Sequence, residues 1–110
     1  MKIQDKSYVL NFTGGQLEVP INDVFNLTQK ITIGAWIKPT SGTGLQATIL
    51  SKGYKIFEPQ VQNNKLVFER GPEYASASNI AMNEWVYITI TFDSTIASDN
   101  LTFYINGKLD

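Results

Sequence analysis

A tryptophan on the polar side of an alternating stretch is the first residue that could bind a ligand. The segment ITIGAWIKP, Ile31–Pro39, places isoleucine or alanine at every second position, while Trp36 falls among threonine, glycine and lysine. Side chains alternate between the two faces of a strand. Trp36 is therefore predicted to lie on the otherwise polar face, where it is either covered or displayed to a ligand.

Two further segments repeat this arrangement. In WVYITITF (85–92), Tyr87 opposes a Val/Ile/Phe face, and in LTFYIN (101–106), Tyr104 and Asn106 oppose Leu, Phe and Ile. Aromatic rings stack on the C–H surfaces of sugars, and amide or hydroxyl groups hydrogen-bond sugar hydroxyls. The alternative is that these aromatic side chains pack beneath loops or against further strands. The predicted ligand-binding set is Trp36, Tyr87, Tyr104 and Asn106.

Calcium is the metal that the sequence allows. Asp93, Asp99 and Asn100 flank the loop STIAS and offer the carboxylate and carbonyl oxygens that Ca²⁺ prefers. The same residue types are common in ordinary turns. We therefore expect no certain cofactor, with Ca²⁺ at Asp93, Asp99 and Asn100 as the candidate.

Two glutamates are predicted to face each other across a hairpin. If Asn63 and Asn64 form a two-residue turn, Gln62 pairs with Lys65 and Glu58 pairs with Glu69. Retaining glycosidases use two carboxyl groups about 5.5 Å apart. A solvated face, or a bulge at Pro59, explains the same residues without catalysis. No nucleophile–base pair is visible, so the protein is expected not to be an enzyme, although it could be an accessory domain of one that acts on glycosides.

The composition excludes several classes of function. The 110 residues contain no cysteine and no histidine, so they supply no disulfide, no cysteine nucleophile and no imidazole base. The net charge is −1 and no basic run occurs, so a nucleic-acid partner is not expected. No apolar run approaches the ~18 residues of a membrane span. The start, MKIQDKSYVLNF, lacks the apolar core of a signal peptide.

Short alternating segments separated by turn residues predict an all-β protein. Residues 22–30 are expected to form a loop with one helical turn, and Asn106-Gly107 is expected to form a hairpin turn. The predicted strands cover Tyr8–Phe12, Gln16–Val19, Ile31–Lys38, Gln46–Lys52, Tyr54–Gln62, Lys65–Arg70, Trp85–Phe92 and Leu101–Asn106.

The order of the segments resembles a known family. LNFTGGQLEVP, ITIGAWIKP, ILSKG, NNKLVFE, NEWVYITITFD and LTFYINGKL together resemble the laminin-G-like, concanavalin A-like jelly-roll modules. The resemblance implies a two-sheet antiparallel sandwich formed by a single domain, residues 1–110. Members of this family continue past the position of YINGKL, so we expect a domain truncated at its C-terminus. Another chain or a further segment is expected to complete the sandwich.

The resemblance also sets the functional expectation. It implies a non-catalytic carbohydrate-binding or adhesion module of a larger extracellular or surface protein, with a glycan or protein ligand. The alternative is a structural module of a virion, tail fibre or surface layer, in which the aromatic face is a protein–protein interface. Either reading places the protein outside the cell, at the cell surface or on a virion, without membrane insertion. Fold alone does not decide between them.

Overall fold

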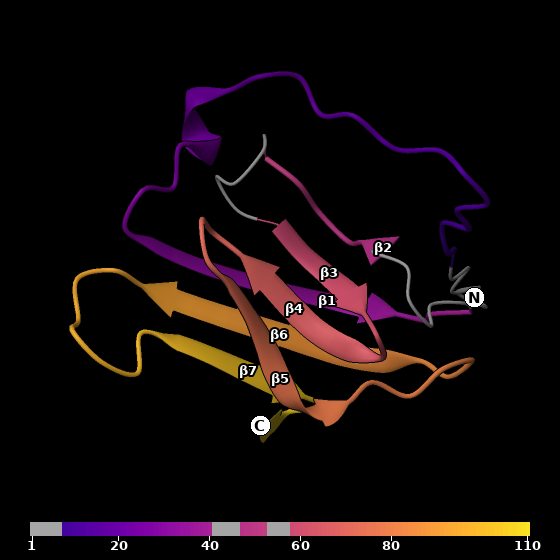
Figure 1. Ribbon diagram of the computed structural model, residues 1–110. Coiled ribbons are helices and arrows are strands. Elements are labelled where there is room, and N and C mark those ends of the chain that lie inside the picture. The colour runs from indigo at the N-terminus through magenta and orange to yellow at the C-terminus, as the bar shows by residue number, and fades with distance from the viewer. Residues whose placement is uncertain (1–7, 41–46, 53–57) are drawn as a thin grey trace, which may run out of the picture.

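The protein is a sandwich of two antiparallel sheets. The computed structural model describes residues 8–40, 47–52 and 58–110, and its two four-stranded sheets lie one in front of the other (Figure 1). This confirms the predicted all-β sandwich. Sheet A has the strand order β1-β6-β7-β8, and sheet B has the order β2-β3-β4-β5. The bounds are β1 Lys30–Ile37, β2 Ala47–Thr48, β3 Glu58–Gln62, β4 Lys65–Glu69, β5 Glu73–Asn79, β6 Val86–Asp93, β7 Leu101–Ile105 and β8 Lys108–Leu109.

Sheet A is built around a regular pair of strands. β1 and β6 run in one register without a bulge, from Lys30 opposite Asp93 to Ile37 opposite Val86. The predicted hairpin turn follows β7, where Asn106 and Gly107 have φ values of 51° and 75°. Positive φ at both central residues is what a type I′ turn requires. The turn brings the short strand β8 back against β7.

Sheet B contains the second predicted hairpin. Asn63 and Asn64 have φ values of 51° and 60°, and they join β3 to β4. The register is the predicted one, with Glu58 opposite Glu69 and no shift at Pro59. The beginning of the predicted strand Tyr54–Gln62 lies outside the described residues. Gln46, the first residue of the predicted strand Gln46–Lys52, lies outside the described residues, and of the remaining six only Ala47 and Thr48 form a strand, β2.

The sequence pattern predicts no strand at β5, because its residues EYASASN lack the β-branched residues that favour strands. β5 is held instead by a side chain at a bulge. The register against β4 shifts between Lys65 and Val67, and Ser76 is buried there with 3% of its surface exposed. The Ser76 hydroxyl accepts from the Leu66 N–H at 3.0 Å and donates to the Ser78 carbonyl at 2.8 Å. The Ser76 hydroxyl thereby gives the Leu66 N–H and the Ser78 carbonyl the hydrogen-bond partners that regular strand pairing would have supplied.

The core lies between the sheets. On sheet A it consists of the apolar positions of β1, β6 and β7, and on sheet B Leu66 and Phe68 of β4 face them. Phe68 is completely buried, and its ring centre lies 5.9 Å from that of Phe92. The fully or largely buried members of this cluster are Ile31, Leu66, Phe68, Ile80, Val86, Ile88, Ile90 and Phe103.

The predicted N-terminal strands are wrong. Tyr8–Phe12 and Gln16–Val19 have strand-like composition, but neither forms a strand, and the segment runs apart from the sheets (Figure 1). A strand exists only where a neighbour takes up its backbone hydrogen bonds. Among the described residues neither segment has such a neighbour. The predicted helical turn is confirmed as the 3-10 helix Asp23–Phe25, where the Asn22 side chain accepts from the Val24 N–H at 3.0 Å.

Asp110 joins the end of sheet A to the bulge of sheet B. Its carboxylate accepts from the N–H groups of Ala77 at 2.5 Å and Ser78 at 2.9 Å, and its own N–H donates to the Phe103 carbonyl at 3.0 Å. Hydrogen bonding by Ser78 is the main reason why the pKa of Asp110 lies below its ordinary value. The Ala77 N–H and the charge of Lys65 act in the same direction, and desolvation opposes them.

Candidate functional site

The outer face of sheet A carries the predicted aromatic residues. The core takes the odd-numbered positions of β1, so Trp36 points to the opposite side, and 64% of its surface is exposed. The β1–β6 register sets Trp36 directly opposite Tyr87. Their ring centres are 5.2 Å apart and the planes are inclined by 48°. The two side chains therefore form one aromatic patch, which we call the Trp36–Tyr87 patch.

Gly34 makes room for this patch. A Cβ at position 34 would stand only 2.7 Å from the Tyr87 hydroxyl oxygen, so the tyrosine lies across the glycine of the neighbouring strand. Any larger residue would displace the phenol. This role of Gly34 was not predicted from the sequence. The available signal was a glycine that interrupts an otherwise regular strand.

Tyr104 and Asn106 take different roles on β7 and its turn. Tyr104 pairs with Thr89, one row along the same face from the Trp36–Tyr87 patch, and is partly exposed. The Asn106 side-chain oxygen accepts from the Tyr87 N–H at 3.0 Å, while the Asn106 N–H donates to the Tyr87 carbonyl at 2.8 Å. Asn106 therefore fixes the backbone beneath the patch, and its side-chain oxygen is already occupied.

Threonines cover the middle of the same face. The registers align Thr32 of β1, Thr91 of β6 and Thr102 of β7 in one row across three strands. Thr89 lies in the row between these residues and the Trp36–Tyr87 patch. Each hydroxyl can both donate and accept a hydrogen bond. The face thus changes from aromatic to hydroxyl-bearing along the strands.

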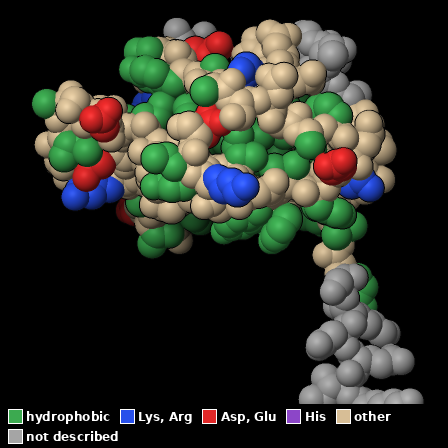
Figure 2. Space-filling model, turned by 90° about the horizontal axis from the view of Figure 1, so that it is seen from below, with side chains coloured by type: hydrophobic (Ala, Val, Ile, Leu, Met, Phe, Trp, Pro, Cys, Tyr) green, Lys and Arg blue, Asp and Glu red, His purple; other side chains and the backbone are tan. Residues whose placement is uncertain are grey.

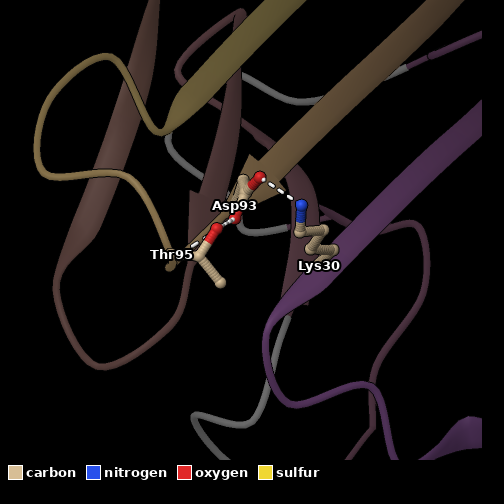
Figure 3. A network of polar contacts seen from close by, with 3 residues as sticks. All are labelled: Lys30, Asp93 and Thr95. Carbon is tan, nitrogen blue, oxygen red and sulfur yellow. Dashed lines mark hydrogen bonds and ion pairs between the residues drawn. The ribbon is translucent and has the colours of Figure 1, made fainter.

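An open hollow of about 420 Å³ lies at the Lys30 end of β1. Lys30 and Asp93, which are paired in the β1–β6 register, form an ion pair of 3.0 Å at its edge (Figure 3). The other Asp93 oxygen accepts from the N–H and the hydroxyl of Thr95. Hydrogen bonding by the hydroxyl and the N–H of Thr95 is the main reason why the pKa of Asp93 lies below its ordinary value. Desolvation opposes this effect, and the hydrogen bond and charge of Lys30 lower the pKa further by smaller amounts.

The three residues of the calcium prediction meet in this hollow. Asp93, Asp99 and Asn100 all line it, and the Asn100 carbonyl accepts from the Asp93 N–H at 2.8 Å. Both carboxylate oxygens of Asp93 are engaged by Lys30 and Thr95. In the described part of the chain, no group of three or more Asp, Glu, His or Cys side chains could hold a metal ion. The arrangement fits Ca²⁺ poorly, because a cation would have to displace the lysine, and the calcium site stays a prediction.

Three glutamates occupy one row of the sheet B register, the glutamate row. Glu58 lies opposite Glu69 as predicted, and Glu69 lies opposite Glu73 on β5. The pairing of Glu73 with Glu69 was not predicted, because β5 itself was not predicted. Like charges directly opposite each other destabilise a sheet. The opposition of Glu69 and Glu73 is therefore expected to cost stability.

Comparison with known proteins identifies one relationship. A family model described as the concanavalin A-like lectin/glucanases superfamily matches residues 12–110. No curated protein and no solved structure matches the chain. Within the ranges that the structure describes, no helix has the length and apolar character needed to cross a membrane.

Proposed function

Because the chain belongs to the concanavalin A-like lectin/glucanase superfamily, we propose that it is a non-catalytic carbohydrate-binding module whose ligand stacks on the Trp36–Tyr87 patch. The observation that carries this proposal is the exposure of Trp36 beside Tyr87 on the solvent face of a regular sheet. Large aromatic side chains are usually mostly buried, so an exposed contacting pair on a flat face indicates a binding surface.

The chemistry of the face supports a sugar over other small ligands. Aromatic rings offer flat apolar area for the C–H side of a pyranose, and the neighbouring Thr89 and Tyr104 offer hydroxyl groups. Seen from below, onto an edge of the sandwich, the molecule shows charged side chains of both signs with hydrophobic side chains between them (Figure 2). A net charge of −1 likewise gives no electrostatic preference for polyanions.

The proposal also covers the biological role of the module and where it acts. A glycan-binding module of this kind would serve in adhesion or as an accessory domain of an enzyme that acts on glycosides. Such ligands are met outside the cell, at the cell surface or on a virion. No step of catalysis is proposed for the glutamate row of sheet B.

Binding to immobilised glycans, followed by calorimetric titration with the best ligand, tests the proposal. Tyr87→Ala is expected to weaken binding about tenfold, the loss of roughly 1.4 kcal/mol of stacking. Tyr74→Ala is the matched control, because Tyr74 is also a half-exposed strand tyrosine but belongs to sheet B. Equal losses for the two variants, or no binding to any glycan, would contradict the proposal.

The second candidate is a structural module of a larger assembly. Among the described strands, β1 lies at the edge of sheet A, with lysines only at and beyond its ends and with no proline and no bulge, so its own sequence lacks the devices that usually protect an edge. Large apolar side chains are also exposed along the N-terminal segment: Tyr8, Val9, Leu10, Phe12, Leu17, Val19 and Ile21. In this reading another chain, or a further segment, adds a strand to β1, and the aromatic face becomes a protein interface.

Light scattering over a range of protein concentrations tests this second candidate. Strand addition between chains predicts a mass that rises with concentration. A monomer at every concentration, together with water-exposed tryptophan emission, would count against it.

A further inference from the structure

We propose that the bulge of β5 is a binding site for a carboxylate of a partner peptide, and that Asp110 occupies this site as an internal ligand which an aspartate or glutamate side chain of the partner can replace. The site consists of the consecutive N–H groups of Ala77 and Ser78. It lies where β5, the last strand of sheet B, comes close to the C-terminal end of the chain (Figure 1). The site is separate from the Trp36–Tyr87 patch, and its ligand is not a sugar.

The two N–H groups hold a carboxylate by both of its oxygens. The Ala77 N–H donates to one oxygen of Asp110 at 2.5 Å, and the Ser78 N–H donates to the other at 2.9 Å. Successive backbone N–H groups are a recurrent means of binding anions, and a charged acceptor makes such hydrogen bonds shorter and stronger. A side-chain amide offers one acceptor oxygen where a carboxylate offers two. The geometry therefore favours a carboxylate.

Contacts that do not involve Asp110 hold the two N–H groups in place. The buried Ser76 hydroxyl accepts from the backbone of β4 and donates to the Ser78 carbonyl. The Lys65 ammonium donates to the Ala77 carbonyl. Because the Ala77 carbonyl and the Ser78 N–H belong to one planar peptide unit and point in opposite directions, this bond turns the Ser78 N–H toward the carboxylate. The site is therefore formed by the bulge itself and not by its present occupant.

Positive charge and an open hollow adjoin the site. Hydrogen bonding by Ser78 is the main cause of the lowered pKa of Asp110, and the charge of Lys65 acts in the same direction, against desolvation. The hollow has a volume of about 350 Å³, within the range of roughly 300–1,000 Å³ that is usual for ligand sites. An ammonium, an amide and two apolar side chains are among its lining residues, which are Ser78, Ile105, Asn106, Lys108, Leu109 and Asp110. These groups suit the body of a peptide next to the bound carboxylate.

The strand that carries Asp110 is short and lies at the surface. β8 consists of Lys108 and Leu109, which are both exposed, and it pairs with β7 over two residues. Ala77 and Ser78 are exposed as well, so a partner can reach their N–H groups when Asp110 leaves. A short exposed edge strand opens at a lower cost in free energy than a core strand. The occupant in the structure is an aspartate at the end of a strand, and a partner peptide can offer the same group.

Chemical rescue of an Asp110 variant tests the site. Asp110→Ala frees the two N–H groups, and sodium acetate is then titrated at neutral pH while the amide signals of Ala77 and Ser78 are recorded. Acetate should bind saturably and return both signals toward their positions in the unmodified protein. It should also raise the midpoint of thermal unfolding of the variant by about 4–8 °C. Acetamide, which has the same shape without the charge, and sodium chloride at equal ionic strength are the controls and should do neither.

The variants should rank by how well their own side chain fills the site. The acetate concentration at half-saturation should rise about tenfold or more from Asp110→Ala to the unmodified protein, with Asp110→Asn between them. In the Asp110→Ala background, Lys65→Gln should weaken acetate binding about two- to fivefold. Lys30→Gln is the matched control, because the Lys30 ammonium pairs with Asp93, and it should leave acetate binding unchanged.

A small peptide tests the class of ligand. N-acetyl-aspartate methylamide should move the same two amide signals at concentrations about tenfold below those of acetate, because its body contacts the hollow. Equal affinities of the two probes would overturn the peptide as the ligand. Equal effects of acetate and acetamide, or unchanged Ala77 and Ser78 signals in a variant whose core signals are native, would overturn the site. Asp110→Asn, which keeps the size of the side chain, gives the same readout should the alanine variant not fold.

Discussion

Replacing Gly34 with alanine is expected to move the Tyr87 ring without unfolding the sheet. A Cβ at position 34 would stand 2.7 Å from the Tyr87 hydroxyl oxygen and 3.5 Å from its ring carbon Cζ. Ordinary contact begins near 3.4 Å, so the hydroxyl end must retreat by about 0.7 Å, the difference between the two distances. The displacement changes the face that Tyr87 and Trp36 present together.

The stability of the sheet should change little. Glycine in a strand interior costs ~0.5–1 kcal/mol relative to alanine, so the substitution of Gly34 returns part of that free energy. Displacing Tyr87 loses part of the ~0.5–1.5 kcal/mol that an aromatic pair contributes. The two effects oppose each other, and the free energy of unfolding is expected to change by less than about 1 kcal/mol.

Urea unfolding and fluorescence separate the two effects. In a Trp85→Phe background Trp36 is the only tryptophan, so its emission and near-ultraviolet circular dichroism report the patch alone. Gly34→Ala should alter both spectra and weaken glycan binding about tenfold. Gly15→Ala is the control, because a Cβ there meets nothing within 4 Å. Unaltered spectra and affinity for Gly34→Ala, or a loss of more than ~2 kcal/mol of stability, would refute the reasoning.

Three further predictions concern the scaffold. Asp110→Asn should lower the free energy of unfolding at pH 7 by about 1 kcal/mol, because the charged acceptor of two exposed N–H groups of the β5 bulge is lost. Since folding lowers the pKa of Asp110 from 3.8, its contribution is fully present above that pH and disappears as the pH falls through the folded value, so denaturation of the two proteins should converge in acid. Glu73→Gln should raise stability by ~0.2–1 kcal/mol by removing the like charge opposite Glu69, with a smaller gain in high salt; a decrease would contradict the β4–β5 register. Phe68→Ala should cost ~3–5 kcal/mol in the same assay, and a loss below ~1 kcal/mol would mean that the ring is not in the core.

Alternation and turn chemistry predicted most of sheet A and the β3–β4 hairpin. Apolar residues at every second position fix which face is buried, and Asn-Asn and Asn-Gly fix the turns through positive φ. These are local properties, so they can be read from neighbouring residues. The opposition of Glu58 and Glu69 followed from the turn alone.

Other features depend on partners that are distant in the sequence. β5 is a strand because Ser76 and Asp110 satisfy its irregular backbone, and neither contact has a local signal. The segments Tyr8–Phe12 and Gln16–Val19 have strand-like composition but no described neighbour. The aromatic residues of the candidate site were predicted from the alternation of side chains between the two faces of a strand. Their contact and the space made by Gly34 required the β1–β6 register.

The most direct test of carbohydrate binding at the Trp36–Tyr87 patch follows the emission of Trp36 during a glycan titration. The Trp85→Phe protein is titrated with the oligosaccharide that binds best, and acrylamide quenching is measured at each point. Binding at the patch predicts a shift of the emission to shorter wavelength and protection from acrylamide, both saturating at the calorimetric affinity. Saturable binding that leaves the emission and the quenching of Trp36 unchanged would contradict the account.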